Sequence, residues 1–516
     1  MKTRKLLLMF LVLALAVGSV FANGKKETVI DETKPVKIVF LLDQTSSEMK
    51  PDGEVKKIID ERFDVDIQSW SLDTKKFYDQ LNVRFAGGEM PDVFIADSGK
   101  LPDYVDGGIL HELPIEVIRA KAPNYAACVD ATDPDIWNAM MYNGVNYGIS
   151  NPMSVYPMAV YWRKDWLDNL NLAVPTTIAE MERVLLAFVN DDPDGNGKND
   201  TAGMGERAFN AVFGAYGLRV ATGNKPGFKV EEMQLNEEGL PYFPYIDSDA
   251  KEVLELLNRW YNLGILDKEF VTGENHGGYA WLSHSFMNGR IGCTVAQVSH
   301  YLFGPDTSNP ENWGTCMKEF KGLCPDGDIV IGPAPIGPYG ESGTEGWARA
   351  GKQCVFTQKA FDDPRKIDRI LAMLDAYYSD MDYAVLATYG IKDNHYKETD
   401  NGLLRLKDGV EIRQEGILQV SFGNTIPFAN FTRKGAEDFS RSVTDKGYFR
   451  LSIPSTTEFT NAIATLDTLT EQAYFDIITG SKPLAYFDVY VERFLKSGGA
   501  SALEAVQTAY KKTLGK

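Results

Sequence analysis

The chain has 516 residues, of which 44% are hydrophobic and 24% are charged, and its formal net charge is −19 at pH 7. This length exceeds what one hydrophobic core usually holds and predicts two domains. The acidic balance excludes nucleic acid and anionic lipid as expected partners, because both carry negative charge themselves.

The first 22 residues have the pattern of a secretory signal peptide. Three basic residues precede an apolar run over residues 6–17, which is too short to span a bilayer comfortably. Small residues around Phe21 predict cleavage after Ala22, which removes three cations and no acid and so lowers the net charge from −19 to −22. No cysteine lies near that point, so we expect a periplasmic protein without a lipid anchor, beginning with a polar leader over residues 23–34.

Strand and helix patterns alternate after the leader. The apolar run Val36–Asp43 predicts a buried parallel strand, helical spacing of apolar residues predicts a helix over 55–63, and Val65–Ser69 alternates like a second strand. A helix over 77–85 then leads to a strand over Val93–Ala96. These units predict an α/β domain with a parallel sheet.

Asp97 and Ser98 follow directly on the last of these strands. Ligands of open α/β sheets bind beyond the carboxyl ends of the strands, so both residues are candidates for the wall of a ligand site. An equally good interpretation is that Asp97 caps the next short helix.

The later sequence predicts further α/β structure. Short strands are expected over 291–297 and 328–331, another begins at Val355, a helix covers 364–378, and the tail is mostly helical. The absence of a low-complexity linker favours two lobes that the chain crosses several times.

Five cysteines are an odd number for an oxidising compartment, so at least one has no partner within the chain. Cys316 and Cys324 are the pair closest in sequence. They either form a disulfide or are buried thiols, and both interpretations stay open.

Six segments resemble, in the same order, motifs of the family 1 extracellular solute-binding proteins. The motifs are FAGGEMPDVF (Phe85–Phe94), GGIL with Leu113 (Gly107–Leu113), NGVNYGI (Asn143–Ile149), YWRKDW (Tyr161–Trp166), PTT (Pro175–Thr177) and FMNGRIG (Phe286–Gly292). Within that family the length and an acidic Gly-rich loop look most like the large oligosaccharide-binding branch that includes the alginate-binding proteins.

This resemblance implies a two-lobed periplasmic-binding-protein fold of the α/β class, with a hinge and a ligand cleft between the lobes. It implies a monomeric receptor that closes on a carbohydrate, an oligosaccharide, and delivers it to the permease of an ABC importer. The first lobe is expected to hold residues 35–150 and 345–395. The second is expected to hold 151–344 and, with the helical tail, 396–516.

The segment from Asp192 to Asp200 predicts a calcium loop. Side-chain oxygens stand at positions 1, 3, 5 and 9 with Gly197 at position 6, as in the first part of an EF-hand, and a backbone carbonyl at position 7 adds a fifth donor. Position 12 is Gly203 instead of Glu, so Thr201, water or a distant residue completes the site. The alternative is a solvated turn. The expected structural calcium ligands are Asp192, Asp194, Asn196, Lys198 and Asp200.

A saccharide site combines aromatic rings with amides, hydroxyls and carboxylates, because sugars have flat C–H faces and many hydroxyls. Several aromatic residues lie near expected crossings or strand ends, although each aromatic by itself is more often a core residue. With Asp97 and Ser98, the candidate ligand residues are Tyr156, Tyr161, Trp281, Gln297, His300 and Trp347.

Two other functions compete with a binding protein of an importer. A secreted carbohydrate-active enzyme would share the acidic, aromatic-rich composition, but no GxSxG or HExxH motif is present and the five histidines are scattered. We therefore expect no catalysis. A periplasmic sensor would share the fold and the ligand chemistry, and the sequence does not separate it from a transport receptor.

Overall fold

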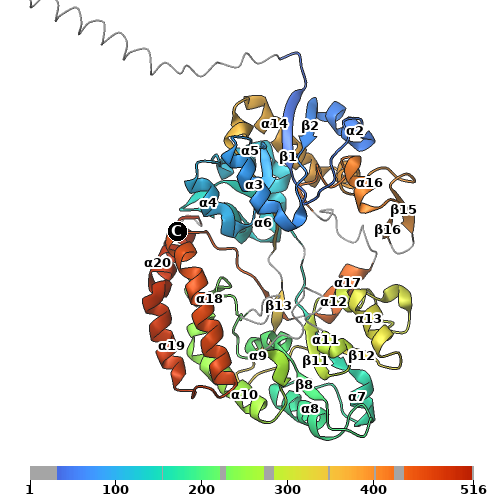
Figure 1. The fold of residues 1–516 in the computed structure, drawn as a ribbon, viewed down its shortest axis with the longest axis vertical. Helices are drawn as coiled ribbons and strands as arrows, with labels where there is room; N and C mark the ends of the chain where they lie inside the picture. The colour runs from blue at the N-terminus through green and yellow to red at the C-terminus, as the bar shows by residue number, and fades with distance from the viewer. Residues whose placement is uncertain are drawn as a thin grey trace, which may run out of the picture.

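The structure is a computed structural model, and it describes residues 32–513 except 154, 221–227, 272–283, 347–348, 400–401, 424–434 and 445. The expected signal peptide lies outside these residues. Two α/β lobes are stacked along the long axis, and the last three helices run along one side (Figure 1). No helix in the described ranges is long and apolar enough to cross a membrane.

The first lobe is built on a five-stranded sheet of order β2-β1-β3-β14-β6. Its strands are β1 (Val36–Leu41), β2 (Val65–Ser69), β3 (Val93–Ile95), β6 (Gly148–Pro152) and β14 (Ala350–Phe356). β1 is parallel to β2 and β3, whereas β14 is antiparallel to β3 and β6. The start of β14 therefore lies at the same edge of the sheet as the carboxyl ends of β1 and β3.

Helices cover both faces of this sheet because their apolar sides pack on Ile38, Phe40 and Val93, all buried. The stripe of Phe77, Leu81 and Phe85 is buried in a second cluster. The helices are α2 (Glu54–Phe63), α3 (Phe77–Ala86), α4 (Leu101–Asp106), α5 (Ile115–Lys121), α6 (Pro123–Thr132), α14 (Pro364–Ser379), α15 (Met381–Tyr389) and α16 (Gly409–Gln414).

The second lobe is built on a four-stranded sheet of order β12-β7-β11-β8. β7 (Ala159–Arg163) is antiparallel to β11 (Ile291–Ala296) and β12 (Ile329–Gly332), and β8 (Ala202–Met204) is parallel to β11. The predicted strands near 291–297 and 328–331 are thus confirmed.

The helices of the second lobe include the three C-terminal ones, which pack into its main core. They are α7 (Lys164–Asn169), α8 (Ile178–Asn190), α9 (Phe209–Gly214), α10 (Ser248–Asn262), α11 (His284–Met287), α12 (Val298–Tyr301), α13 (Thr315–Leu323), α17 (Ala436–Val443), α18 (Thr457–Ile478), α19 (Tyr486–Phe494) and α20 (Ala500–Thr513).

Two chain crossings between the lobes run antiparallel and are hydrogen-bonded to each other. The crossing from β6 to β7 is paired with the crossing from β13 (Thr344–Gly346) to β14. Met153 N donates to Arg349 O at 2.8 Å, and Met158 N donates to Glu345 O at 2.8 Å. β13 also pairs with β17 (Gly447–Phe449) in the same region, and Figure 1 shows β13 between the lobes.

Residues 396–422 differ from the expected lobe assignment. Tyr396, Ile412, Ile417 and Phe422 are buried with the first sheet, whereas we expected this segment in the second lobe. The hairpin of β15 (Tyr396–Thr399) and β16 (Gly402–Arg405) therefore belongs to the first lobe. The reason is apolar burial, because Phe422 packs edge to face on Phe40 of β1 with ring centroids 6.0 Å apart.

All five cysteines are free thiols. Cys316 lies at the start of α13 and Cys324 caps its end. Eight residues of helix separate Cα atoms by about 12 Å, far beyond the roughly 4.4–6.8 Å that a disulfide needs. The interpretation as thiols therefore holds for this pair.

Candidate functional site

Two adjoining cavities of about 610 and 190 Å³ lie between the lobes and share Ser98, Ala350, Gln353 and Arg450 as lining residues. The first lobe lines them with the residues that follow β1 and β3 and with the start of β14. The cleft thus lies at the carboxyl edge of the parallel strands, as the sheet topology requires.

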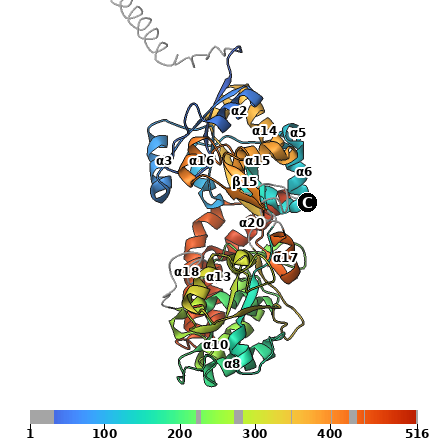
Figure 2. The same ribbon diagram turned by 90° about the vertical axis from the view of Figure 1, so that its right-hand side faces the viewer.

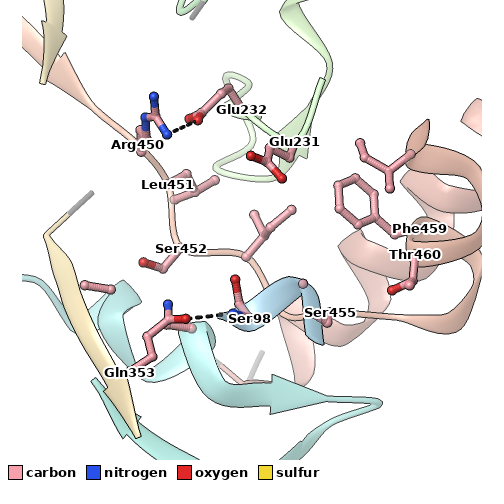
Figure 3. A pocket seen from close by; sticks show the side chains of 15 residues that line it. Ser98, Glu231, Glu232, Gln353, Arg450, Leu451, Ser452, Ser455, Phe459 and Thr460 are labelled. Atoms are coloured by element: carbon pink, nitrogen blue, oxygen red, sulfur yellow. Dashed lines mark hydrogen bonds and ion pairs between the residues drawn. The ribbon is translucent and has the colours of Figure 1, made fainter. Parts of the chain in front are cut away.

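Asp97 and Ser98, both predicted as wall residues, line this cleft. The Tyr78 hydroxyl donates to Asp97 Oδ2 at 2.7 Å, and Ser98 N donates to Gln353 Oε1 at 2.7 Å (Figure 3). The alternative role of Asp97 as a helix cap has no support, because its side chain makes no capping hydrogen bond to the following turn.

The opposite wall contains a buried cluster of one arginine and two glutamates. Arg450 binds Glu232 Oε1 at 2.7 Å and reaches Glu345 Oε1 with two N–H groups at 2.8 and 2.9 Å. Burial lowers the pKa of Arg450, but attraction to Glu232 and Glu345 outweighs burial, so the net shift is upward. The guanidinium is therefore held charged and in one orientation.

The floor of the smaller cavity is apolar. α18 begins after Thr456, whose hydroxyl accepts from Phe459 N at 3.2 Å, and this cap sets the first turn of the helix. Phe459, Thr460 and Leu451 then line the cavity (Figure 3), as do Ile453 and Ile463. Apolar surface next to hydroxyls, an amide and carboxylates is the combination that a saccharide site needs.

Other predicted ligand residues lie elsewhere. Tyr161 is fully buried, with its ring centroid 4.5 Å from that of Tyr301, so its prediction as a ligand contact is wrong. β7 is covered on both faces, and an aromatic residue in such a strand packs in the core. Tyr156 lies on the first crossing, where its hydroxyl bonds Glu437, and it lines neither of the two cavities.

Gln297 and His300 follow β11, at the sheet end where Ala296 pairs with Ala159 beside the first crossing. They are partly buried and line neither of the two cavities. Burial lowers the pKa of His300 to about 4, and Arg207 adds to this shift. Trp281 and Trp347 lie outside the described residues.

The acidic loop after α8 folds around its own side chains. Asn196 Nδ2 donates to Asp194 Oδ2 at 2.8 Å and to Asp200 Oδ1 at 3.1 Å, and Gly197 N donates to Asp192 Oδ2 at 2.9 Å. Partial burial raises the pKa of Asp194, and the nearby Asp192 and Asp200 add to this shift. The four side chains thus converge, and their carboxylates repel one another.

The donor atoms of this loop are of the types that bind a hard cation, but they are not arranged as a metal site. Three carboxylates and an amide oxygen are the ligand types that calcium prefers. Within the described ranges, however, no group of three or more acidic, histidine or cysteine side chains is placed as a metal cage. The Thr201 hydroxyl donates to Phe188 O at 2.6 Å, so it is turned toward α8 and away from the loop.

Residues 450–455 form the part of the cleft that sequence reasoning missed, because the tail was interpreted as mostly helical. The structure has an extended segment there, in which Ser455 N donates to Met141 O at 2.9 Å in the first lobe. Gly447 and Pro454, which bracket the segment, were the available signals for a break in the helical pattern. Glu231 and Glu232 looked like any exposed acidic pair.

Similarity to known proteins supports the two-lobed fold. The family described as "Bacterial extracellular solute-binding protein" matches residues 47–270. The Polygalacturonan/rhamnogalacturonan-binding protein YtcQ of Bacillus subtilis (strain 168) is 24% identical over 528 residues, which cover 98% of each chain.

Two solved structures share the fold over nearly the whole chain. Alginate-binding protein AlgQ2 without calcium ion has a TM-score of 0.60 at 18% identity, covering 93% of this chain and 98% of that one. The EF-hand mutant of the Streptococcus pneumoniae substrate-binding protein FusA, in complex with fructo-nystose, has a TM-score of 0.59 at 17% identity, covering 93% and 99%. Its motifs, its two lobes and these relatives thus make the chain similar to the bacterial extracellular solute-binding proteins, whose family model matches residues 47–270.

Proposed function

We propose that this protein is the substrate-binding component of an ABC importer and that it binds an oligosaccharide between its lobes. The observation that carries the proposal is the cleft, where Phe459 and Ile463 offer apolar surface opposite Ser98 and Gln353. The relatives with the same organisation are named for binding polygalacturonan, rhamnogalacturonan and fructooligosaccharide.

We propose Ser98, Asp97, Gln353 and Phe459 as ligand contacts. Sugar hydroxyls donate to carboxylate and amide oxygens and accept from N–H and O–H groups, while a ring face packs on Phe459. Tyr156, Gln297, His300, Trp281 and Trp347 stay predictions, since the two described cavities do not include them.

Calcium is proposed at the loop after α8, held by Asp192, Asp194, Asn196, Asp200 and the Lys198 carbonyl. The support is the donor chemistry of the loop and the raised pKa of Asp194, which partial burial causes and to which the nearby Asp192 and Asp200 add. When bound, the ion supplies structural charge compensation. The loop lies outside the two cavities between the lobes, so we assign it no contact with the ligand.

The proposed cellular setting is the periplasm, with export by a signal peptide cleaved after Ala22 and without a lipid anchor. The proposed partners are the ligand and the permease subunits of the importer, and the receptor acts as a monomer without catalysis. The proposed lobe division is 35–152 with 350–422 for the first lobe, and 159–346 with 436–513 for the second, which follows the two sheets and their cores.

The test is thermal unfolding of the mature protein against neutral oligosaccharides, uronate oligomers, amino acids and peptides. A ligand at 100 times its Kd stabilises the native state by about 2.7 kcal/mol, so the binding class raises Tm measurably. Chromatography of the saccharide after incubation should show no product. Product formation, or a shift with peptides alone, contradicts the proposal.

The variant Gln353→Ala tests the cleft itself. It removes the amide that lines both cavities and orients Ser98, and we expect at least tenfold weaker binding, about 1.4 kcal/mol. Gln68→Ala is the matched control, because Gln68 is exposed on β2 outside the two cavities. Equal loss of affinity in both variants would contradict a ligand role for this cleft.

A further inference from the structure

We infer that the cleft selects neutral oligosaccharides and rejects polymers of uronic acids, because carboxylates stand on both of its walls while its described cationic side chains are already engaged. This inference rests on the proposed function and narrows its substrate class. Among the described residues that line the two cavities are four carboxylic acids, Asp43, Asp97, Glu231 and Glu232, and two basic residues, Lys352 and Arg450.

Arg450 is the side chain that a sugar carboxylate would be expected to seek, since a guanidinium binds carboxylates in a bidentate manner. Here Glu232 and Glu345 already occupy three of its N–H groups, at 2.7 to 2.9 Å. Both glutamates are buried, with side-chain exposures of 8% and 2%. Moving Arg450 onto a ligand would leave two buried carboxylates without their cation, which is strongly unfavourable.

The second oxygen of Glu345 adds to this demand on Arg450. Oε2 is buried and has no hydrogen-bond partner among the described residues, so Glu345 depends on Arg450 for compensation of its charge. Two buried glutamates thus share one guanidinium at this wall, and burial, opposed by Arg450, raises the pKa of Glu232 to about 8. An incoming sugar carboxylate would add a third acid to the same cation.

Lys352 is the second cation of the cleft and is also engaged. Its Nζ donates to Ser421 O at 2.7 Å, and burial lowers its pKa. The neighbouring Asp43 already has a cationic partner, since Arg413 Nε donates to Asp43 Oδ2 at 2.6 Å. At this corner of the larger cavity Arg413 thus already compensates Asp43, and Lys352 is buried against a backbone carbonyl.

The two remaining acids face the ligand space from opposite sides. Asp97 follows the end of β3 in the first lobe, and its carboxylate accepts a hydrogen bond from the Tyr78 hydroxyl. Glu231 lies across the pocket from Ser98 and Gln353, beside Leu451, and its neighbour Glu232 turns toward Arg450 (Figure 3). Both Asp97 and Glu231 are exposed.

A neutral sugar and the corresponding uronic acid differ only in a hydroxymethyl group that replaces a carboxylate. The hydroxyl can donate to Asp97 or Glu231, whereas a carboxylate only accepts and repels both. Lobe closure would remove the water that screens this repulsion between carboxylates, and the repulsion would become stronger. The cleft is thus suited to ligands that are rich in donors and carry no negative charge.

The test uses matched pairs of oligosaccharides, namely short oligomers of galacturonate, glucuronate and mannuronate and their carboxyl-reduced counterparts of the same linkage. Isothermal titration at low and high salt should show a neutral member binding at least tenfold more tightly than its acidic partner. Salt should strengthen the weak binding of the acid, because it screens repulsion. An acidic member that binds as tightly as its neutral partner, or that weakens with salt, would overturn the inference while leaving the proposed function supported.

Glu231→Gln is the variant that tests the residue assignment. It should raise the affinity for the acidic member relative to the neutral one by at least threefold, whereas the exposed Glu237→Gln outside the two cavities should leave the ratio unchanged. If the ratio of the affinities for the acidic and the neutral member is the same in both variants and in the wild type, Glu231 does not contribute to the selection. Failure of every saccharide to bind would overturn the proposed function and this inference together.

Discussion

At the scale of single residues, Glu206 is the clearest case of an acid whose buried position disfavours its charged form. It lies in a short turn between β8 and α9 and is only 7% exposed. Burial, with a contribution from Asp267, raises its pKa to about 7 from the ordinary 4.5, although Arg207 opposes the shift. The folded state therefore keeps a proton that the unfolded chain loses near pH 4.5.

This gives a pH-dependent prediction for Glu206→Gln. Because the folded pKa is raised, the contribution of Glu206 to stability is complete below about pH 4.5 and is lost as pH rises through 7. The amide needs no proton, so the variant should be more stable than wild type at pH 8, by up to about 3 kcal/mol, and equally stable at pH 4.

Urea unfolding at the two pH values measures this difference. The exposed Glu237→Gln serves as the control and should match wild type at both. A stability difference between Glu206→Gln and wild type that does not depend on pH would contradict burial as the cause of the raised pKa.

At the scale of elements, the loop that follows α8 shows how local spacing and local geometry agree. Alternating oxygens predicted convergence, and the hydrogen bonds from Asn196 to Asp194 and Asp200 bring these side chains together. Pro193 is buried and its carbonyl accepts from Asn169 Nδ2 at 2.9 Å, which ties the loop to α7. A cation bound here would stabilise the contact between α7 and α8.

For this element we predict that calcium raises Tm and that a chelator reverses the effect. Asp194→Asn should remove most of the calcium-dependent rise, because it takes one of three charged ligands from the loop. Asp191→Asn is the matched control, since Asp191 is exposed and precedes the first loop position. A calcium response that survives in Asp194→Asn would place the ion elsewhere.

At the scale of the whole molecule, the antiparallel crossings make the natural hinge. Their shared backbone hydrogen bonds, from Met153 to Arg349 and from Met158 to Glu345, couple the two strands of chain that must bend together. The side view in Figure 2 shows the lobes as separate bodies joined at the middle of the molecule. Hinge closure around a ligand is the motion that such connections permit.

We therefore predict that the radius of gyration in solution scattering decreases when the saccharide found in the thermal screen is added. The ligand adds contacts to both walls only in the closed form, so it shifts the population toward that form. Gln353→Ala, which weakens binding, should need proportionally more saccharide for the same decrease. An unchanged radius at saturation would rule out closure.

The sequence by itself determined the elements and one edge of the cleft. Apolar runs and helical spacing located β1, β2, β3 and α14, because backbone hydrogen bonding imposes their periods locally. Asp97 and Ser98 were found because a parallel strand must end at the ligand edge of its sheet. The family motifs extend from β3 in the first lobe to β11 in the second, which is why the resemblance also indicated two lobes.

Only the tertiary structure decided which distant residues meet. Three separate segments supply Glu232, Glu345 and Arg450, and no local sequence pattern predicts that these side chains are in contact. Tyr161 was misjudged because an aromatic residue on a strand has the same sequence signal whether it packs inward or contacts a ligand. The tertiary structure also decided where segments 396–422 and 450–455 lie. Their positions depend on the packing of the two cores and of the chain crossings, and this packing overrides local secondary-structure preference.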